Sequence, residues 1–281
     1  MAEHSEPIAA HPSGAARPPG SVHPPGADSP PARRSGGVQS VTRAIDLLAL
    51  LAEEGPEMAL SELAERTGLA TATTHRLIRT LVDHGYVRQL PSRRYALGPA
   101  LIRLGEHAGM HLGSAARVHL ADLAARVGET VNLAMLDQDT VVYIAQSASK
   151  HSMRMFTEVG RRVPAHATGV GKATLAQLDD GQVHRIITRA GMPAMTDRTI
   201  TDPEAFLAEM GRIRERGYAI DDGEQEVGVR CVAMAIAQAP APTAVSISGP
   251  AARLPEEKVE QVVPELARTA EVLSELYATE N

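Results

Sequence analysis

The order of sequence patterns in segment 38–98 constrains the fold of this chain more than any other feature. After Gly37, apolar residues recur at the i, i+3, i+4 and i+7 spacing of an amphipathic helix. Gly55-Pro56 ends this helix. The residues predicted to face inward are Val41, Ala44, Ile45, Leu48 and Leu51.

Two shorter helices and two strand-like runs follow. Ser61 is predicted to cap the second helix, and the third helix begins at Thr71. The runs 86–90 and 94–97 then read as two short strands. The predicted inward residues are Leu63 and Ala64 in the second helix and Leu77, Ile78, Leu81 and Val82 in the third. This helix-helix-helix-hairpin order predicts a winged helix-turn-helix.

Strand-like and helical patterns alternate in the rest of the chain. Segment 99–127 reads as helix with a break near Gly113, which suits a connector between two bodies. Strands are predicted at 130–136, 140–146, 229–237 and 244–248, and helices at 168–189, 202–216 and 255–278. Strands interleaved with helices make this region α/β or α+β.

Composition limits the class of protein. Segment 1–37 holds eight Pro, five Gly and five Ser, so it cannot bury enough surface to offset ordering and is predicted to be a disordered tail. The single cysteine, Cys231, fits a reducing compartment, and no apolar stretch is long enough to cross a membrane. We therefore expect a cytoplasmic protein without a membrane partner.

The start of the third helix has the residues that DNA reading requires. In a helix-turn-helix, the N-terminal residues of the second motif helix meet base edges in the major groove, so they should be small, polar or basic. Aromatic residues make up only 2% of the chain, which favours duplex DNA over stacked single strands. The predicted DNA contacts are Thr71, Ala72, Thr73, His75, Arg76 and Arg79 on the helix, with Arg93 and Arg94 on the hairpin.

Basic residues are concentrated in the segment that holds the predicted DNA contacts. The formal net charge is −6, yet segment 70–98 carries five arginines against one acid, Asp83. Segment 38–69 carries two arginines against six acids. A basic face inside an acidic protein suits phosphate contact. The alternative is a protein-docking module whose arginines form a solvated face.

Several motifs resemble the IclR family of bacterial regulators. The N-terminal ones are VQSVTRA at 38–44, TATTHRLI at 71–78 and GYV at 85–87. The C-terminal ones are GRRVPAHATGVGKA at 160–173, GYAIDDGE at 217–224 and GVRC at 228–231. The likeness covers about residues 38–278 and implies a regulator that binds double-stranded operator DNA.

The resemblance also implies the domain organisation. It implies an α+β chain with an N-terminal winged helix-turn-helix domain at 38–98, a connector helix at 99–113 and an effector-binding domain at 114–281. That last domain is expected to be GAF-like, with a mainly antiparallel sheet flanked by helices. It further implies assembly as a homodimer or homotetramer.

Within the family, the chain looks most like the allantoin- and glyoxylate-responsive repressors. This likeness is carried by Met153-Arg154-Met155, by the spacing of Asp221 and Cys231, and by 246–250. The predicted effector is thus a ureide or a small carboxylate: allantoin, allantoate or glyoxylate. The ligand-binding residues that follow are Gly169, Val170, Asp221, Cys231, Ser246 and Ser248.

The chemistry of these residues suits a small polar ligand. Ser246 and Ser248 are two apart, so on a strand their hydroxyls share a face. Asp221 would accept from ureide N–H groups, and glycine at 169 permits close approach of backbone donors. The alternative is structural: strand serines often bond to backbone, a buried cysteine packs as a small hydrophobe, and an aspartate caps a turn.

Catalysis, metal binding and a cofactor are not predicted. The sequence GVGK at 169–172 lacks the first glycine and the final Ser or Thr of a phosphate loop, since His166 and Ala173 occupy those places. Cys231 has no histidine at a distinctive spacing to act as its base, and the histidines lack zinc-site spacing. A metabolite-binding enzyme that carries a winged helix is the rival hypothesis; we expect a repressor that its effector releases from DNA.

Overall fold

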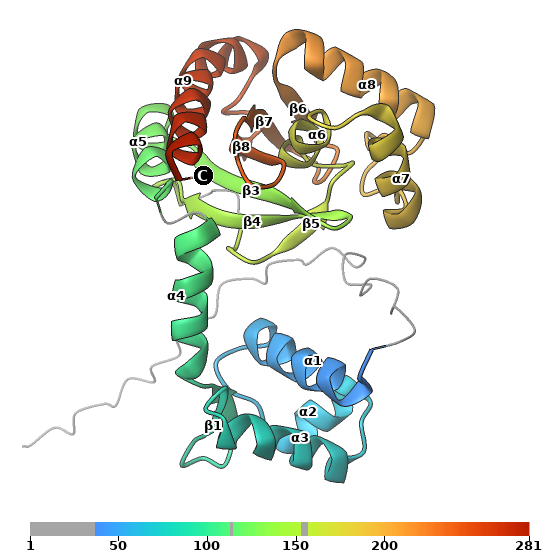
Figure 1. The fold of residues 1–281 in the computed structure, drawn as a ribbon, viewed down its shortest axis with the longest axis vertical. Coiled ribbons are helices and arrows are strands. Elements are labelled where there is room, and N and C mark those ends of the chain that lie inside the picture. Colours follow the sequence, from blue (N-terminus) through green and yellow to red (C-terminus); the bar gives the residue numbers. More distant parts are fainter. Residues whose placement is uncertain (1–36, 113–114, 153–156, 281) are drawn as a thin grey trace, which may run out of the picture. The chain divides into compact units, whose positions relative to one another are not determined.

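The computed structural model describes residues 37–112, 115–152 and 157–280, and it shows the mixed α+β architecture that the sequence predicts (Figure 1). An N-terminal part consists of helices and a hairpin, and a C-terminal part is built on a six-stranded sheet. No helix in these ranges is long and apolar enough to span a membrane. The predicted disordered tail lies outside the described residues except for Gly37.

The N-terminal part has the predicted order of elements. Helix α1 is Gln39–Glu53, α2 is Leu60–Thr67 and α3 is Thr71–Asp83. Strands β1, Val87–Gln89, and β2, Tyr95–Leu97, pair antiparallel as a hairpin. The helices and the hairpin enclose one core, whose buried residues are Leu47, Leu51, Met58, Leu63, Ile78, Leu81, Val87 and Tyr95.

The inward face predicted for α1 is wrong at two positions. Val41 and Ile45 are 55% and 58% exposed, whereas Leu47 is fully buried. The apolar stripe of α1 is wider than the surface that α2, α3 and the hairpin cover, so one edge of the stripe is left in solvent. The spacing predicts the helix correctly but does not say how much of its apolar face this part of the chain covers.

The prediction that Ser61 caps α2 is also wrong. The helix begins at Leu60, and Ala59 holds the cap position. The Glu62 carboxylate accepts a 2.8 Å hydrogen bond from the Ala59 N–H, which is the half of a capping box that the third helical residue supplies. Gly68 ends the helix as predicted, with a φ of +65° that favours glycine.

Two helices occupy the segment predicted as a broken connector. Helix α4 is Ala100–Leu112 and α5 is Arg117–Val127. The predicted break at Gly113 falls on residues 113–114, outside the described part of the chain. Gly128 ends α5 with a φ of +79°.

The sheet of the C-terminal part is antiparallel throughout, with the strand order β5-β4-β3-β8-β7-β6. Its central strands β3, β8 and β7 are the apolar runs predicted from the sequence. The strands are β3 Thr130–Asp137, β4 Thr140–Ser147, β5 Arg162–Pro164, β6 Ala219–Asp222, β7 Val229–Ile236 and β8 Thr243–Pro250. The two short edge strands, β5 and β6, were not predicted.

One face of this sheet packs against α6, Gly169–Leu175, with α7, Asp180–Ala190, and α8, Pro203–Arg216, beyond it. The single helix predicted at 168–189 is therefore two helices. The chain breaks after α6, and Asp179 caps α7 by accepting a 2.8 Å hydrogen bond from the Gln182 N–H.

The other face of the sheet packs against α5 and the C-terminal helix α9, Glu256–Glu280 (Figure 1). Alternate strand residues fill this second core, among them Leu133, Val232, Val245 and Ile247, all fully buried. The sheet is thus buried on both faces, so any polar side chain on it must find a partner inside the protein or a bound ligand.

Candidate DNA interface and effector site

The first turns of α3 expose most of the predicted base-reading side chains to solvent. Thr71, Ala72, His75 and Arg76 are exposed, and Thr73 is half-buried. The inward positions of the helix are filled by other residues, of which Thr74 and Ile78 are fully buried. The predicted base-reading residues therefore lie on the free side of the helix, where a DNA groove has access to them.

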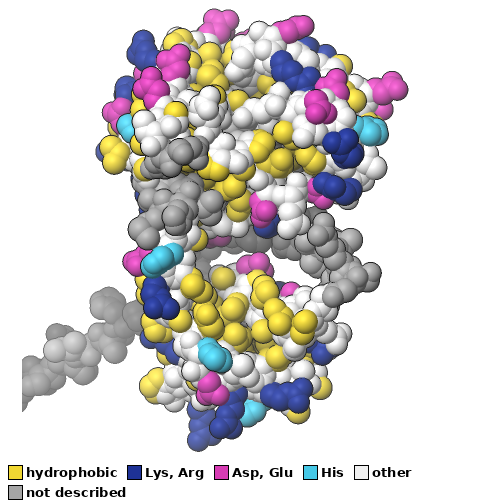
Figure 2. Space-filling view, in the orientation of Figure 1, with side chains coloured by type: hydrophobic (Ala, Val, Ile, Leu, Met, Phe, Trp, Pro, Cys, Tyr) yellow, Lys and Arg dark blue, Asp and Glu magenta, His cyan; other side chains and the backbone are white. Residues whose placement is uncertain are grey.

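Exposed arginines extend this surface. Arg76 and Arg79 lie on α3, and Arg88 and Arg93 lie on the hairpin. Figure 2 shows Lys and Arg side chains gathered where α3 and the hairpin meet solvent. Arg93 stands at the tip of the hairpin turn with a φ of +62°, a conformation unusual for a residue with a side chain.

Arg94, predicted as a DNA contact, has protein partners in the structure. Its guanidinium donates a 2.8 Å hydrogen bond to Glu62, and its Nε lies 3.4 Å from a Glu57 carboxylate oxygen. The sequence prediction treated the neighbouring arginines Arg93 and Arg94 alike, because it could not see that acids from α2 and the turn before it reach only the second.

The predicted ligand residues of the sheet lie side by side. In the antiparallel register, Asp221 on β6 is opposite Cys231 on β7, which is opposite Ser248 on β8. Directly opposed residues share a face, and two-residue spacing places Ser246 on that face as well. All four are buried beneath the α6 side of the sheet. We call Asp221, Cys231, Ser246 and Ser248 the polar row.

The hydrogen bonding of the polar row is incomplete. The Ser248 hydroxyl donates to the Cys231 Sγ over 3.2 Å. The Ser246 hydroxyl is buried and has no hydrogen-bond partner among the described residues. An unpaired buried hydroxyl is unfavourable, so Ser246 is the member of the row that would gain most from a hydrogen bond to a bound ligand.

Helix α6 covers the polar row with its N-terminus. Gly169, its first residue, packs against Cys231, and Val170 is buried in the core beside it. Thr168 caps the helix, since its hydroxyl accepts a 3.1 Å hydrogen bond from the Gly171 N–H. The structure therefore brings Gly169 next to one member of the row, as the ligand-site prediction requires.

A polar network that the sequence prediction missed continues the row onto β3 and β4. Asn132 is fully buried, and its amide donates to the Ser248 hydroxyl over 3.3 Å. Its carbonyl oxygen accepts from Gln146 at 3.2 Å and from Thr157 at 2.8 Å. The sequence did hold a clue: Asn132 is a lone polar residue within the apolar run of β3.

A buried ion pair, also missed, lies next to the β6 end of the polar row, since the Glu224 N–H donates to Asp221. Lys172 is 1% exposed, and its ammonium group is paired with Glu224 and donates a 2.5 Å hydrogen bond to the Ile220 carbonyl. The second carboxylate oxygen of Glu224 is buried with no hydrogen-bond partner among the described residues. The sequence analysis weighed Lys172 only as part of a phosphate loop.

Burial changes the acidity of the row. It raises the pKa of Asp221 to about 7, although backbone hydrogen bonds from Glu224 and Gln225 oppose this rise. The Asp221 carboxylate accepts from these N–H groups at 2.7 and 3.4 Å, so it also caps the turn after β6. Burial raises the pKa of the Cys231 thiol to about 11, so the thiol is protonated at neutral pH and poorly suited to nucleophilic attack.

Two models of known protein families match this chain. The model of the IclR helix-turn-helix domain matches residues 40–91, and that of the bacterial transcriptional regulator IclR C-terminal domain matches residues 107–275. The chain belongs to the IclR family.

Relatives of this IclR-family chain are named as regulators and not as enzymes. The transcriptional repressor IclR of Escherichia coli is 37% identical over 253 residues, which cover 88% of this chain and 92% of the relative. A transcriptional regulator of Rhodococcus sp. RHA1 has a solved structure with 31% identity and a TM-score of 0.76, covering 87% of this chain and 100% of that one. The enzyme hypothesis is not favoured.

The comparisons do not single out a subgroup for this IclR-family chain. The repressor AllR of Salmonella typhi is 33% identical over 228 residues, 79% of this chain and 84% of the relative. That identity is no higher than the value for IclR itself. Met153-Arg154-Met155, which carried part of the subgroup prediction, lies outside the described ranges.

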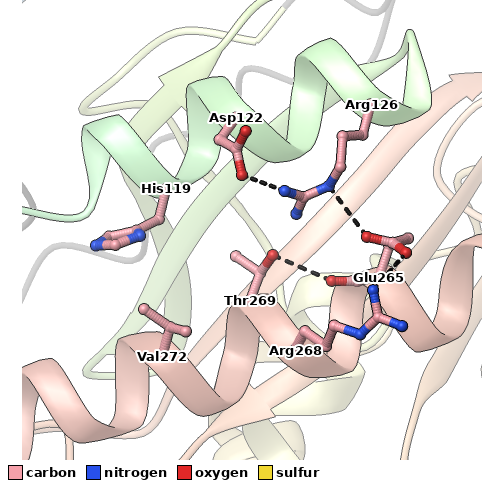
Figure 3. A pocket seen from close by; sticks show the side chains of 7 residues that line it. All are labelled: His119, Asp122, Arg126, Glu265, Arg268, Thr269 and Val272. Carbon is pink, nitrogen blue, oxygen red and sulfur yellow. Dashed lines mark hydrogen bonds and ion pairs between the residues drawn. The ribbon is translucent and has the colours of Figure 1, made fainter.

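A separate groove of about 270 Å³ lies between α5 and α9 (Figure 3). Its charged side chains pair with one another: Arg126 lies 3.0 Å from Glu265 and is also paired with Asp122, and Arg268 lies 2.9 Å from Glu265. It is on the far side of the sheet from the polar row, so it is not the predicted effector site.

Proposed function

We propose that this IclR-family chain is a cytoplasmic transcriptional repressor that a small polar metabolite releases from its operator. The observation that carries the DNA-binding part is the exposed N-terminal surface of α3, with Arg76 and Arg79 beside it, within a helix-turn-helix whose relatives are named as repressors. In this proposal Thr71, Ala72, Thr73, His75 and Arg76 read base edges in the major groove.

The hairpin would position the helix on the duplex. Arg93 and Arg79 are exposed and basic, which suits contacts with phosphate or the minor groove. Such contacts supply affinity that depends on salt and little on sequence.

A homodimer is the proposed DNA-binding unit, alone or as a dimer of dimers. Val38, Val41 and Ile45 leave an apolar surface on α1 that is 67%, 55% and 58% exposed, and Figure 2 shows hydrophobic side chains gathered over this helix. Burial of that surface against a second copy would stabilise a two-fold pair. Two α3 helices would then meet successive major grooves of a near-palindromic operator.

The polar row is the proposed effector site, with Gly169 and Val170 above it. Its unpartnered Ser246 hydroxyl and its buried Asp221 suit a small ligand that both donates and accepts hydrogen bonds. Ureides and small carboxylates meet this requirement, and we propose allantoin, allantoate or glyoxylate as first candidates.

Binding at the two sites would be coupled through segment 99–127. Allosteric coupling is typically worth about 1–3 kcal/mol, and it is reciprocal. If the effector weakens DNA binding, then operator DNA must weaken effector binding by the same factor.

The DNA-binding proposal is tested by the affinity of the wild-type chain for duplexes tiled across the DNA that flanks its own gene. We expect one duplex to bind at least about a thousandfold more tightly than random sequence at physiological salt. Equal affinity for every duplex at all salt concentrations would reject the proposal in favour of a protein-docking module.

The effector proposal is tested by calorimetry with the three candidate metabolites. We expect heat of binding for at least one of them with wild type, and none with Asp221→Ala. The same experiment should be repeated in the presence of the tightest duplex, where reciprocity predicts weaker binding. Absence of heat from all three compounds would remove the ureide and small-carboxylate proposal.

A further inference from the structure

The hairpin is hydrogen-bonded to the segment before α2. The backbones of Met58 and Tyr95 exchange two hydrogen bonds, of 2.9 and 2.7 Å. Arg94, the residue before this bridge, donates a 3.2 Å hydrogen bond to the Glu57 carbonyl. The second strand of the wing is thus joined to residues 57–58 by both main chain and side chain.

The same guanidinium also binds the first turn of α2. Arg94 donates a 2.8 Å hydrogen bond to Glu62, whose carboxylate in turn accepts the Ala59 N–H. The hydrogen bond from the Ala59 N–H is the main cause that lowers the pKa of Glu62 below its ordinary value, and the Arg94 guanidinium adds to it. Glu62 therefore stays ionised. Arg94 therefore has two carboxylates, Glu57 and Glu62, as partners before any DNA arrives.

We infer that Arg94 is a positioning residue that fixes the wing relative to the reading helix, and not a phosphate contact. This inference rests on the proposed DNA-binding function. Arg93 is adjacent, is exposed and donates its backbone N–H to the Leu90 carbonyl over 2.8 Å. By holding the second strand of the hairpin in place, Arg94 therefore places the exposed guanidinium of Arg93 against the duplex.

The two roles of Arg94 predict opposite effects of its acidic partners. If Arg94 contacted phosphate, Glu57 and Glu62 would compete with DNA for it, and neutralising either acid would tighten binding. If Arg94 instead acts as a clamp that holds the hairpin in place, neutralising Glu57 or Glu62 loosens the hairpin. DNA binding is then weakened, although the protein becomes less negative. The sign of this change separates the two roles.

The test measures the dissociation constant across a range of salt for a random duplex and for the preferred duplex. For Arg94→Ala we expect roughly tenfold weaker binding to both duplexes, but no further fall in the salt slope when Arg94→Ala is added to Arg93→Ala, because Arg94 acts through the Arg93 contact. For Arg93→Ala we expect the slope itself to fall by about 1, because one phosphate contact is lost. A fall of about 2 in the slope of the double variant, as expected for two independent phosphate contacts, would overturn the inference.

Glu62→Gln gives the decisive second measurement. Its amide oxygen can still accept the Ala59 N–H, so α2 keeps its cap while the ion pair is lost. We expect weaker binding, and a total loss smaller than the sum of the two single losses when Arg94→Ala is added, since both changes act on the same clamp. Glu65→Gln, an exposed residue of the same helix, is the matched control: it removes the same charge and should tighten binding slightly.

The outcomes also separate this inference from the function on which it rests. If the wild-type chain shows no preference for any duplex, the proposed function fails first. If wild type binds specifically but Glu62→Gln tightens binding as Glu65→Gln does, the clamp alone is rejected. Circular dichroism and thermal melting of each variant confirm that the loss of binding comes from a folded protein.

Discussion

Gly169 lies so close to Cys231 that a Cβ atom on the glycine would come within 2.9 Å of the cysteine Sγ. The backbone angle at 169 is not in the left-handed region, so packing, not conformation, requires glycine here. The start of α6 and the middle of β7 are therefore in direct contact beside the polar row. Any ligand that displaces the Cys231 side chain must also move α6.

Gly169→Ala should lower the free energy of unfolding by about 1–3 kcal/mol, the usual effect of overpacking. Denaturant unfolding measures this loss. Adding Cys231→Ala removes the atom that clashes, so the double variant should lose less than the sum of the single changes. Strictly additive losses would show that the two residues do not press on each other.

Asp221→Asn should change how stability depends on pH. A carboxyl whose folded pKa is raised from 3.8 to about 7 is destabilising when ionised. Its penalty is therefore absent at low pH and grows as pH rises toward 7. Relative to wild type, Asp221→Asn should gain at most about 3 kcal/mol of stability from pH 5 to pH 8, because the penalty grows by about 1.36 kcal/mol per pH unit over the two units between pH 5 and 7.

Unfolding of both proteins at pH 5, 6, 7 and 8 checks this prediction. Asp197→Asn, which removes a carboxylate at an exposed loop position, is the control. A stability difference between wild type and Asp221→Asn that stays constant over the whole range would contradict the argument from burial.

Lys172→Met should cost about 3–5 kcal/mol of stability, because it leaves Glu224 buried without its counter-charge. Adding Glu224→Leu should recover much of that loss, since no unpaired charge then remains. Thermal and denaturant unfolding measure both effects. If Lys172→Met alone is as stable as wild type, the ion pair is not held in the interior as the structure shows.

Asn132→Ala should destabilise the protein by about 1–3 kcal/mol and weaken effector binding. Removal of its carbonyl oxygen leaves Gln146 and Thr157 without a shared acceptor. Removal of its amide frees the Ser248 hydroxyl, which is part of the proposed site. Calorimetry and unfolding should be run on the same variant; retention of both effector affinity and stability would show that the network is dispensable.

Arg76→Ala should reduce the preference for operator over random duplex by about 1–3 kcal/mol, as expected for a side chain that reads a base. The other proposed role, phosphate contact, would weaken both duplexes equally and lower the salt slope. Competition binding with the two duplexes distinguishes these outcomes. The exposed Arg103 on α4 is a control that removes the same charge outside the reading helix.

Local patterns in the sequence predicted most of the elements of this fold, although not the edge strands β5 and β6 or the break between α6 and α7. The spacing of apolar residues predicted α1 and α3, and strand-like runs predicted β3, β4, β7 and β8. These predictions succeed because helix and strand periods are properties of the chain itself. The family motifs likewise lie in continuous segments, so they were visible before any fold was known.

Contacts between distant segments decided the rest. The exposure of Val41 and Ile45 depends on which helices happen to cover α1, and the pairing of Arg94 with Glu62 joins residues 32 positions apart. The sequence supplied the residue types of the polar row, but only the register of β6, β7 and β8 placed Asp221, Cys231 and Ser248 together. Side-chain periodicity is local, whereas the partner of a charge or a buried hydroxyl is set by how the elements pack.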